Sequence, residues 1–92
     1  MIKYGMYFYD ANGPKTGLSP EILKWAYADG TSPGAFPTIN EITEVDGMYY
    51  FEWLPLQEIF ILVDSKDTSM APQFRYIPMV IYPERNFNVE GL

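Results

Sequence analysis

The 92-residue sequence contains no cysteine and no histidine. Without cysteine there can be no disulfide, no thiolate chemistry and no zinc site built on cysteine. Without histidine the chain lacks the commonest general base and the commonest transition-metal ligand. From these two absences we expect a protein that is not an enzyme and that holds no metal and no cofactor.

Positive charge is also scarce. Six basic residues stand against twelve acidic ones, which gives a formal net charge of −6. The basic residues form no run or stripe: they are Lys3, Lys15, Lys24, Lys66, Arg75 and Arg85. Nucleic acids and anionic membranes both require clustered positive charge. We therefore predict neither as a partner.

Long apolar runs are missing too. No stretch approaches the roughly 20 apolar residues of a membrane-spanning helix. Residues 1–5 do not resemble the start of a signal peptide, because no charged region is followed by an apolar run. We expect a soluble protein that is made in the cytoplasm and is either used without export or released by lysis.

Aromatic residues, in contrast, are abundant, at 17% of the chain. A chain of this length forms one domain with a thin core. That core cannot hide eight Tyr, six Phe and two Trp, and exposed aromatics are typical of binding interfaces. We assign Trp25, Phe51, Trp53 and Phe60 to the core. As surface contacts for a partner we select Tyr7, Tyr9, Tyr50 and Tyr82.

Proline and glycine recur at short intervals, which is typical of a fold with many strands and turns. The pattern predicts strands at residues 2–9, 21–28, 38–45, 48–53, 58–64 and 74–82. Residues 20–29 are the best candidate for a helix, but their apolar positions follow no 3.6-residue period, so a strand is favoured.

Three local signals refine these strands. Asp46-Gly47 suits the two-residue type I′ turn of a hairpin. The nearly continuous apolar run at 58–64 predicts a central strand covered on both faces. Pro78 indicates an edge strand or a bulge, and Pro14 indicates that pairing of the first strand ends in the turn at 10–14.

Together the strands predict an all-β fold, a small antiparallel β-sandwich of immunoglobulin-like type with six or seven strands. A small barrel is the alternative. The sandwich domain covers residues 1–82, and residues 83–92, which have no strand period, form a C-terminal tail or arm. We expect this arm to dock on a neighbouring molecule through its apolar residues Phe87, Val89 and Leu92.

Clusters of acidic residues offer little chemistry. Asp10 begins a segment that starts like a calcium loop and has Glu21 at its twelfth position. Pro14 and Lys15 then occupy the positions of a third ligand and of the required glycine, so a tight turn is the better interpretation. The carboxylates of Glu41, Glu44 and Asp46 are interpreted as solvated.

Several short motifs resemble those of a known group of proteins. They are Phe-Tyr-Asp-Ala-Asn-Gly at 8–13, Thr-Gly-Leu-Ser-Pro at 16–20, a strand with Trp25 followed by Ala-Asp-Gly-Thr at 28–31, Ile-Thr-Glu-Val-Asp-Gly-Met-Tyr-Tyr-Phe at 42–51, and an apolar strand ending in Val-Asp at 63–64. Over residues 4–64 the chain resembles small immunoglobulin-like or transthyretin-like β-sandwich proteins encoded in the structural gene clusters of tailed phages and prophages. It is similar, more distantly, to carboxypeptidase regulatory-like domains. It departs from these after Trp53, where Leu-Pro-Leu-Gln replaces their Pro-Gly turn.

The resemblance implies a non-enzymatic structural or accessory protein of the virion, as a head decoration, neck or tail component. Its partners would be copies of itself and a larger virion shell or tail protein, and its location the virion. The aromatics leave an alternative open, a carbohydrate-binding or adhesion module. That module would require two or three coplanar exposed aromatic rings.

Overall fold

A computed structural model describes residues 2–82 of the chain. The predicted contacts at Phe87, Val89 and Leu92 lie outside these residues. The elements are β1 (Ile2–Tyr7), β2 (Tyr9–Asp10), β3 (Gly13–Pro14), β4 (Glu21–Tyr27), β5 (Asn40–Glu41), β6 (Met48–Trp53), β7 (Ile59–Asp64), α1 (Pro72–Arg75) and β8 (Tyr76–Ile81).

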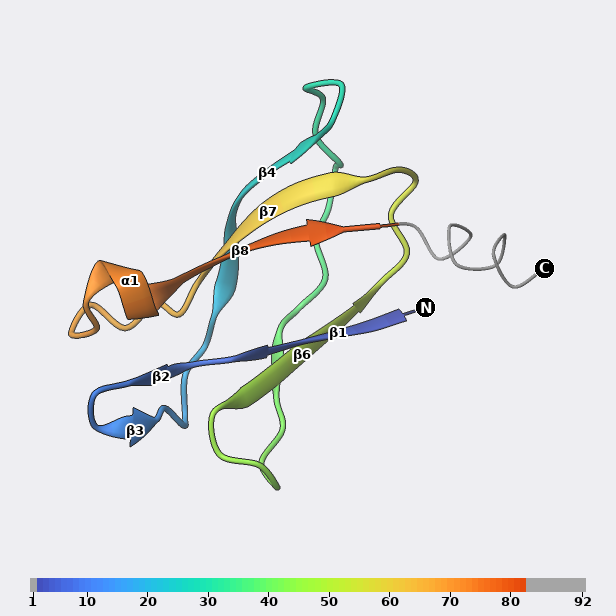
Figure 1. Ribbon diagram of the computed structural model, residues 1–92. Helices are drawn as coiled ribbons and strands as arrows, with labels where there is room; N and C mark the ends of the chain where they lie inside the picture. The colour runs from blue at the N-terminus through green and yellow to red at the C-terminus, as the bar shows by residue number, and fades with distance from the viewer. Residues whose placement is uncertain (1, 83–92) are drawn as a thin grey trace.

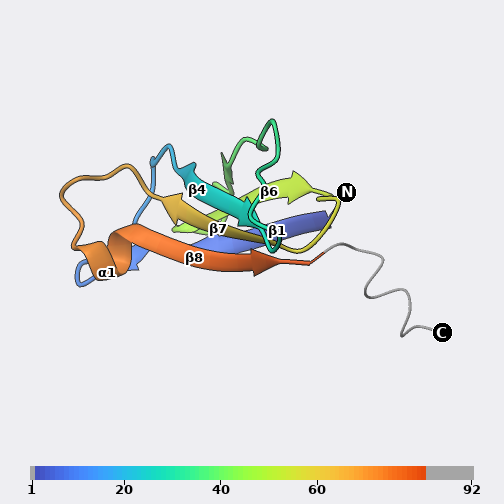
Figure 2. The same ribbon diagram turned by 90° about the horizontal axis from the view of Figure 1, so that it is seen from above.

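The strands form two three-stranded antiparallel sheets and one small hairpin. Sheet I has the order β1-β6-β5, sheet II has the order β4-β7-β8, and β2 pairs with β3. The two sheets lie one above the other in Figure 1, and Figure 2 views the stack from above. This arrangement confirms the predicted all-β sandwich, and within residues 2–82 the sheets do not close into the alternative barrel.

The core lies between the two sheets. Alternate residues of β6 and β7 point inward, so that Tyr49 and Phe51 of β6 meet Ile59, Ile61 and Val63 of β7. All five side chains are buried, and full burial of a large apolar side chain contributes about 1.5–3 kcal/mol. The strict alternation of β6 is the pattern that its sequence predicts.

The segment predicted as a strand at 38–45 is mostly turn. Only Asn40 and Glu41 pair with β6. The backbone N–H of Val45 donates to the carbonyl of Ile42 at 3.2 Å, and that of Met48 donates to the carbonyl of Val45 at 3.1 Å. Two successive turns therefore replace the second half of the strand.

The predicted type I′ turn at Asp46-Gly47 is also wrong. Gly47 has φ +87°, but Lys66 is the only non-glycine residue among residues 2–82 with positive φ. Asp46 therefore has negative φ, and the two signs fit a type II turn. A type I′ turn would need positive φ at both Asp46 and Gly47. Here the change of direction is shared between two turns, at 42–45 and 45–48, and only Gly47 adopts positive φ.

The strand β7 occupies the centre of sheet II, as predicted, but only one of its faces is covered. Phe60, which points to the outer face, is 45% exposed, and Leu62 is half-buried. Within residues 2–82 no further layer packs on this side of the sheet. The expectation that Phe60 belongs to the core is therefore wrong.

Other boundaries differ in detail. The last predicted strand begins later, because residues 72–75 form the single turn α1. The strand β8 that follows is an edge strand containing Pro78, as predicted. Pro14 does not end the pairing of the first hairpin, since it lies opposite Tyr9 in β3. The prediction that residues 20–29 form a strand rather than a helix is confirmed by β4.

With α1 only four residues long, none of the described helical structure is long and apolar enough to span a membrane.

Candidate protein interaction surface

On one side of the sandwich, two strand edges that carry no further strand among residues 2–82 lie next to each other. The strand β1 is an edge of sheet I and β8 is an edge of sheet II. A groove between them, here called the edge groove, is lined by Gly5, Met6 and Tyr7 of β1 and by residues 76–79 of β8. At the far end of these strands the hydroxyl of Tyr4 donates a hydrogen bond to the carbonyl of Tyr82 at 3.1 Å. This bond joins the two sheets there and leaves the groove open towards Tyr7.

Aromatic rings surround the open end of the edge groove. Tyr7 and Tyr9 are 42% and 48% exposed, and their rings stack with centroids 5.2 Å apart and planes inclined by 23°. The rings of Tyr9 and of Phe74, from α1, form a T-shaped contact with centroids 5.6 Å apart. Tyrosine offers a large apolar area with a polar tip, which suits it to contact a protein partner.

The position of Tyr7 depends on the turn beneath it. Gly47 is buried, and a Cβ atom placed on it would lie 2.7 Å from Cε1 of Tyr7 and 2.9 Å from the carbonyl oxygen of Phe8. The backbone N–H of Phe8 donates to the carbonyl of Gly47 at 2.8 Å. The absence of a side chain at Gly47 therefore lets the turn approach β1 and support the ring of Tyr7.

The position of Phe74 depends on an ion pair next to it in sequence. Arg75 donates from Nε to Oδ1 of Asp64 at 2.8 Å and from Nη2 to Oδ2 at 3.1 Å. The carboxyl group of Asp64 is buried, and its hydrogen bonds with Arg75 hold its pKa below the ordinary value of 3.8 despite the opposing effect of burial. A two-point contact of this kind fixes orientation, so it sets α1 against the end of β7.

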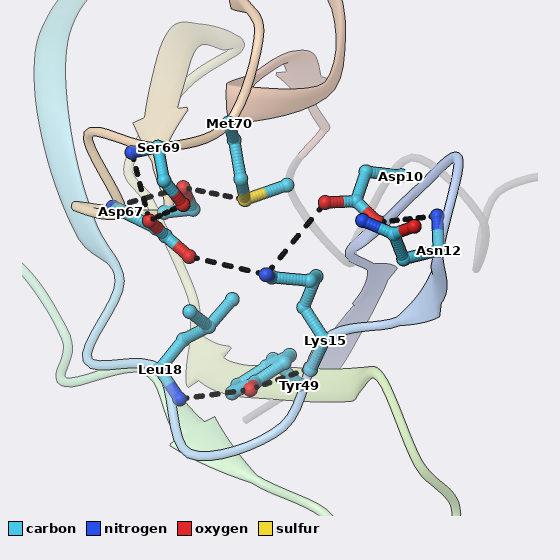
Figure 3. Close-up of polar contacts among 9 residues, drawn as sticks. Asp10, Asn12, Lys15, Leu18, Tyr49, Asp67, Ser69 and Met70 are labelled. Carbon is cyan, nitrogen blue, oxygen red and sulfur yellow. Dashed lines mark hydrogen bonds and ion pairs between the residues drawn. The ribbon is translucent and has the colours of Figure 1, made fainter.

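A second polar cluster ties the β2–β3 hairpin to the loop that follows β7 (Figure 3). Nζ of Lys15 lies 3.6 Å from Oδ2 of Asp10 and 3.4 Å from Oδ2 of Asp67. Each carboxylate also caps its own turn, Asp10 by accepting from the N–H of Asn12 and Asp67 by accepting from Ser69. The segment considered as a calcium loop is therefore a salt-bridged turn. No three acidic residues in the described chain are grouped so that they could hold a metal ion.

The hydroxyl of Tyr49 fixes the chain between β3 and β4. It donates to the carbonyl of Lys15 at 2.9 Å and accepts from the N–H of Leu18 at 3.1 Å. Burial raises the pKa of Tyr49 above its ordinary value, so this hydroxyl keeps its proton at neutral pH. The contacts give Tyr49 a structural role.

Two of the four selected tyrosines, Tyr7 and Tyr9, line the edge groove. Tyr82 is 45% exposed directly after β8, and its backbone carbonyl accepts the hydrogen bond from Tyr4. Tyr50 is half-buried on the outer face of sheet I, where Nζ of Lys3 lies 5.2 Å from the centroid of its ring. Sequence reasoning missed Phe74, which it placed in a strand. Pro72, a residue favoured at the first position of a helix, was the available signal.

The two tryptophans do not form a flat surface. Trp25 and Trp53 are half-buried on either side of Phe36, with ring centroids 4.0 Å and 5.9 Å from it. The exposed pair Tyr7 and Tyr9 stack one over the other rather than side by side in a plane. Neither arrangement gives the coplanar rings that the carbohydrate-binding alternative requires.

The fold and this surface define the molecule as a small antiparallel β-sandwich with an aromatic groove between two open strand edges. Comparison with protein-family models, with curated proteins and with solved structures finds no match to this chain.

Proposed function

We propose that this protein is a non-enzymatic structural or accessory component of a tailed-phage virion, and that it binds its protein partners through the edge groove. The observation that carries the proposal is the stacked pair Tyr7 and Tyr9 beside Phe74 at the mouth of the groove. These rings add exposed aromatic area next to two strand edges that no other strand of residues 2–82 covers, where side chains and backbone can both hold a partner.

The virion assignment rests on the resemblance of residues 4–64 to small sandwich proteins of phage structural gene clusters. A non-enzymatic role agrees with a sequence that has no histidine and no cysteine. The net charge of −6 would keep the free subunit in solution and steer it to a basic patch on a larger shell or tail protein.

The test is incorporation into particles. Particles from cells that produce this protein would be purified by density gradient, and the protein would be measured in them by quantitative mass spectrometry. We expect the wild-type protein in stoichiometric amounts. The double variant Tyr7→Ser/Tyr9→Ser should be reduced at least tenfold, because exposed tyrosines at the centre of an interface contribute about 2 kcal/mol or more.

The matched control is Leu56→Ser, which changes an apolar residue that is 83% exposed in the loop between β6 and β7. It should enter particles like the wild type. Absence of the wild-type protein from purified particles would rule out the virion role. Equal incorporation of the tyrosine variant and the wild type would show that the contact lies elsewhere on the surface.

A further inference from the structure

The outward face of sheet II differs from that of sheet I. An antiparallel sheet with one face towards water normally places polar side chains on that face. In sheet I the outward residue Glu52 of β6 stands opposite Lys3 of β1, as this rule expects. In sheet II the outward residues of β7 include Phe60 and Leu62, and Phe60 is 45% exposed. Large apolar side chains at the centre of an exposed face typically mark a contact with another molecule.

The strand register defines the extent of this apolar area. Six residues stand in two rows across β4, β7 and β8 and are here called the outer patch: Ala26, Phe60 and Val80, then Lys24, Leu62 and Pro78. A shallow hollow of about 400 Å³ lies beside the exposed ring of Phe60, and Lys24, Ala26 and Leu62 contribute to its lining. The outer patch therefore combines an exposed ring with a space next to it.

The charges on this face favour a second copy of the chain as its occupant. The chain has a net charge of −6, so two copies in general repel each other. The outer patch has no acidic residue, and Lys24 is its single charge. Glu58 directly precedes β7, and the period of two places it on the same face as Phe60. Among residues 2–82 neither Lys24 nor Glu58 forms an ion pair, whereas Asp64 at the other end of β7 is buried and paired with Arg75.

We propose that two copies of this chain pair through their outer patches, sheet II against sheet II, about a two-fold axis that crosses the strands between Phe60 and Leu62. Such a contact uses the same surface on both copies, and sheets packed face to face lie about 10 Å apart. The rotation places Phe60 of each copy over Leu62 of the other, next to the hollow. Because it also reverses the direction of the strands, it brings Lys24 of each copy towards Glu58 of the other.

The size of the outer face sets the strength of this pair. With strands about 4.8 Å apart and residues about 3.4 Å apart along each strand, three strands of about six residues span roughly 300 Å². Each partner in a stable complex of standard size contributes roughly 800 Å². We therefore expect a weak dimer, which forms at high concentration and dissociates on dilution.

The experiment measures the mass of the full-length protein by light scattering over a range of concentrations. We expect the mean mass of the wild type to rise from that of a monomer towards that of a dimer. Phe60→Thr should raise the dissociation constant at least tenfold, because a buried aromatic residue at the centre of an interface contributes most to affinity. The matched control is Val45→Thr, since Val45 is 52% exposed in the turn before β6, and this variant should associate like the wild type.

The charged pair provides a second test. Lys24→Glu and Glu58→Lys should each raise the dissociation constant about fivefold, because each places like charges next to one another. The first variant makes the chain more acidic and the second makes it less acidic, so general charge repulsion would move them in opposite directions. The double variant Lys24→Glu/Glu58→Lys keeps the net charge of the wild type and should recover its dissociation constant.

Phe60 and Lys24 are exposed, so far-ultraviolet circular dichroism should show the variants folded. A wild type that stays monomeric up to its solubility limit would overturn the inference and leave a protein of another sequence as the occupant of the outer patch. Unchanged association of Phe60→Thr, or a double charge reversal that fails to restore association, would overturn it as well. The inference goes beyond the proposed function and does not depend on it, because the test of the virion role uses Tyr7 and Tyr9.

Discussion

The two long sides of the sandwich are built differently. On the side of β4 and β5, residues 15–20 lead from the β2–β3 hairpin to sheet II, and residues 28–39 lead from sheet II to sheet I (Figure 1). Phe36 of the second segment packs against both Trp25 and Trp53. On the side of β1 and β8, no segment of residues 2–82 passes from one sheet to the other, and the Tyr4–Tyr82 hydrogen bond joins their ends. We call these the closed side and the open side.

The difference between the two sides assigns them different roles: the closed side stabilises the fold, and the open side is available for binding. The closed side uses its large aromatic side chains internally, so substitutions there should affect stability more than binding. The open side leaves Tyr7 and Tyr9 exposed beside a groove, so its aromatic rings are available to a partner. Two contacts nevertheless position its aromatic rings. The turn at Gly47 packs against Tyr7, and the Arg75–Asp64 ion pair fixes α1, which carries Phe74.

The largest loss of stability is expected from Gly47→Ala, which disturbs the contact between this turn and Tyr7 on the open side. The new methyl group would meet Tyr7 at 2.7 Å and the carbonyl of Phe8 at 2.9 Å, at a residue with φ +87°. Left-handed backbone costs about 1–2 kcal/mol for a residue with a side chain, and overpacking adds about 1–3 kcal/mol. We expect the free energy of unfolding, measured by urea titration, to fall by about 3 kcal/mol.

Two other glycines separate these causes. Gly30 has φ +89° with no atom near its Cβ position, so Gly30→Ala should cost only the backbone strain of about 1 kcal/mol. Gly34 has neither positive φ nor a close neighbour, so Gly34→Ala should leave stability nearly unchanged. If Gly47→Ala costs no more than Gly30→Ala, then crowding against Tyr7 is absent and the turn does not position that ring.

The next effect is expected from Phe36→Ala on the closed side. Replacing a core Phe by Ala costs about 3–5 kcal/mol, and because Phe36 is only half-buried we expect about 2–3 kcal/mol. Trp25 and Trp53 are the only tryptophans in the chain and both flank Phe36. Their fluorescence should therefore shift to longer wavelength in the folded variant, and urea titration would give the loss of stability.

The exposed Leu56 again provides the control, since Leu56→Ala should change the free energy of unfolding by less than about 0.5 kcal/mol. The folded fraction of Phe36→Ala should keep its binding to a partner. If Phe36→Ala lost binding but kept its stability, the closed side would be the binding side, which contradicts our assignment.

The sequence predicts the framework of the fold well, because period-two alternation reports directly on which face of a strand is buried. Met48–Trp53 is an example: its inward residues Tyr49 and Phe51 are fully buried. The apolar run of β7 misled us about Phe60, because periodicity does not reveal whether a second layer covers the outer face of a sheet. The selection of Tyr7 and Tyr9 rests on an aromatic content too high for a thin core to hide, and both side chains are exposed.

The edge groove itself could not be predicted from the sequence. It requires β1 and β8, which stand at opposite ends of the described chain, to become neighbouring edges of different sheets. No short sequence pattern predicts that these two strands become neighbours. Phe74 and Arg75 were missed for a related reason, since a single helical turn is shorter than any periodic pattern, and the partner of Arg75 is eleven residues away at Asp64.

A pH-dependent effect distinguishes the support of the open side from the apolar packing of the closed side. Arg75→Met leaves the buried carboxylate of Asp64 without its main partner. Removing one partner of a buried ion pair is destabilising, so we expect the free energy of unfolding at pH 7 to fall, but by less than in Phe36→Ala because the side chain of Arg75 is 22% exposed. Urea titration of wild type and variant at several pH values measures the difference.

The direction of the pH dependence follows from the lowered pKa of Asp64. A carboxyl group whose pKa is lower in the folded than in the unfolded state stabilises the fold above its ordinary value of 3.8, and that contribution is lost as the pH falls through the folded-state pKa. The difference between wild type and Arg75→Met should therefore be full at pH 7 and shrink below about pH 4. The difference between wild type and Phe36→Ala, which involves no titrating group, should stay constant. If the Arg75→Met difference also stays constant, the ion pair does not hold α1, and the open side is supported by apolar contacts alone.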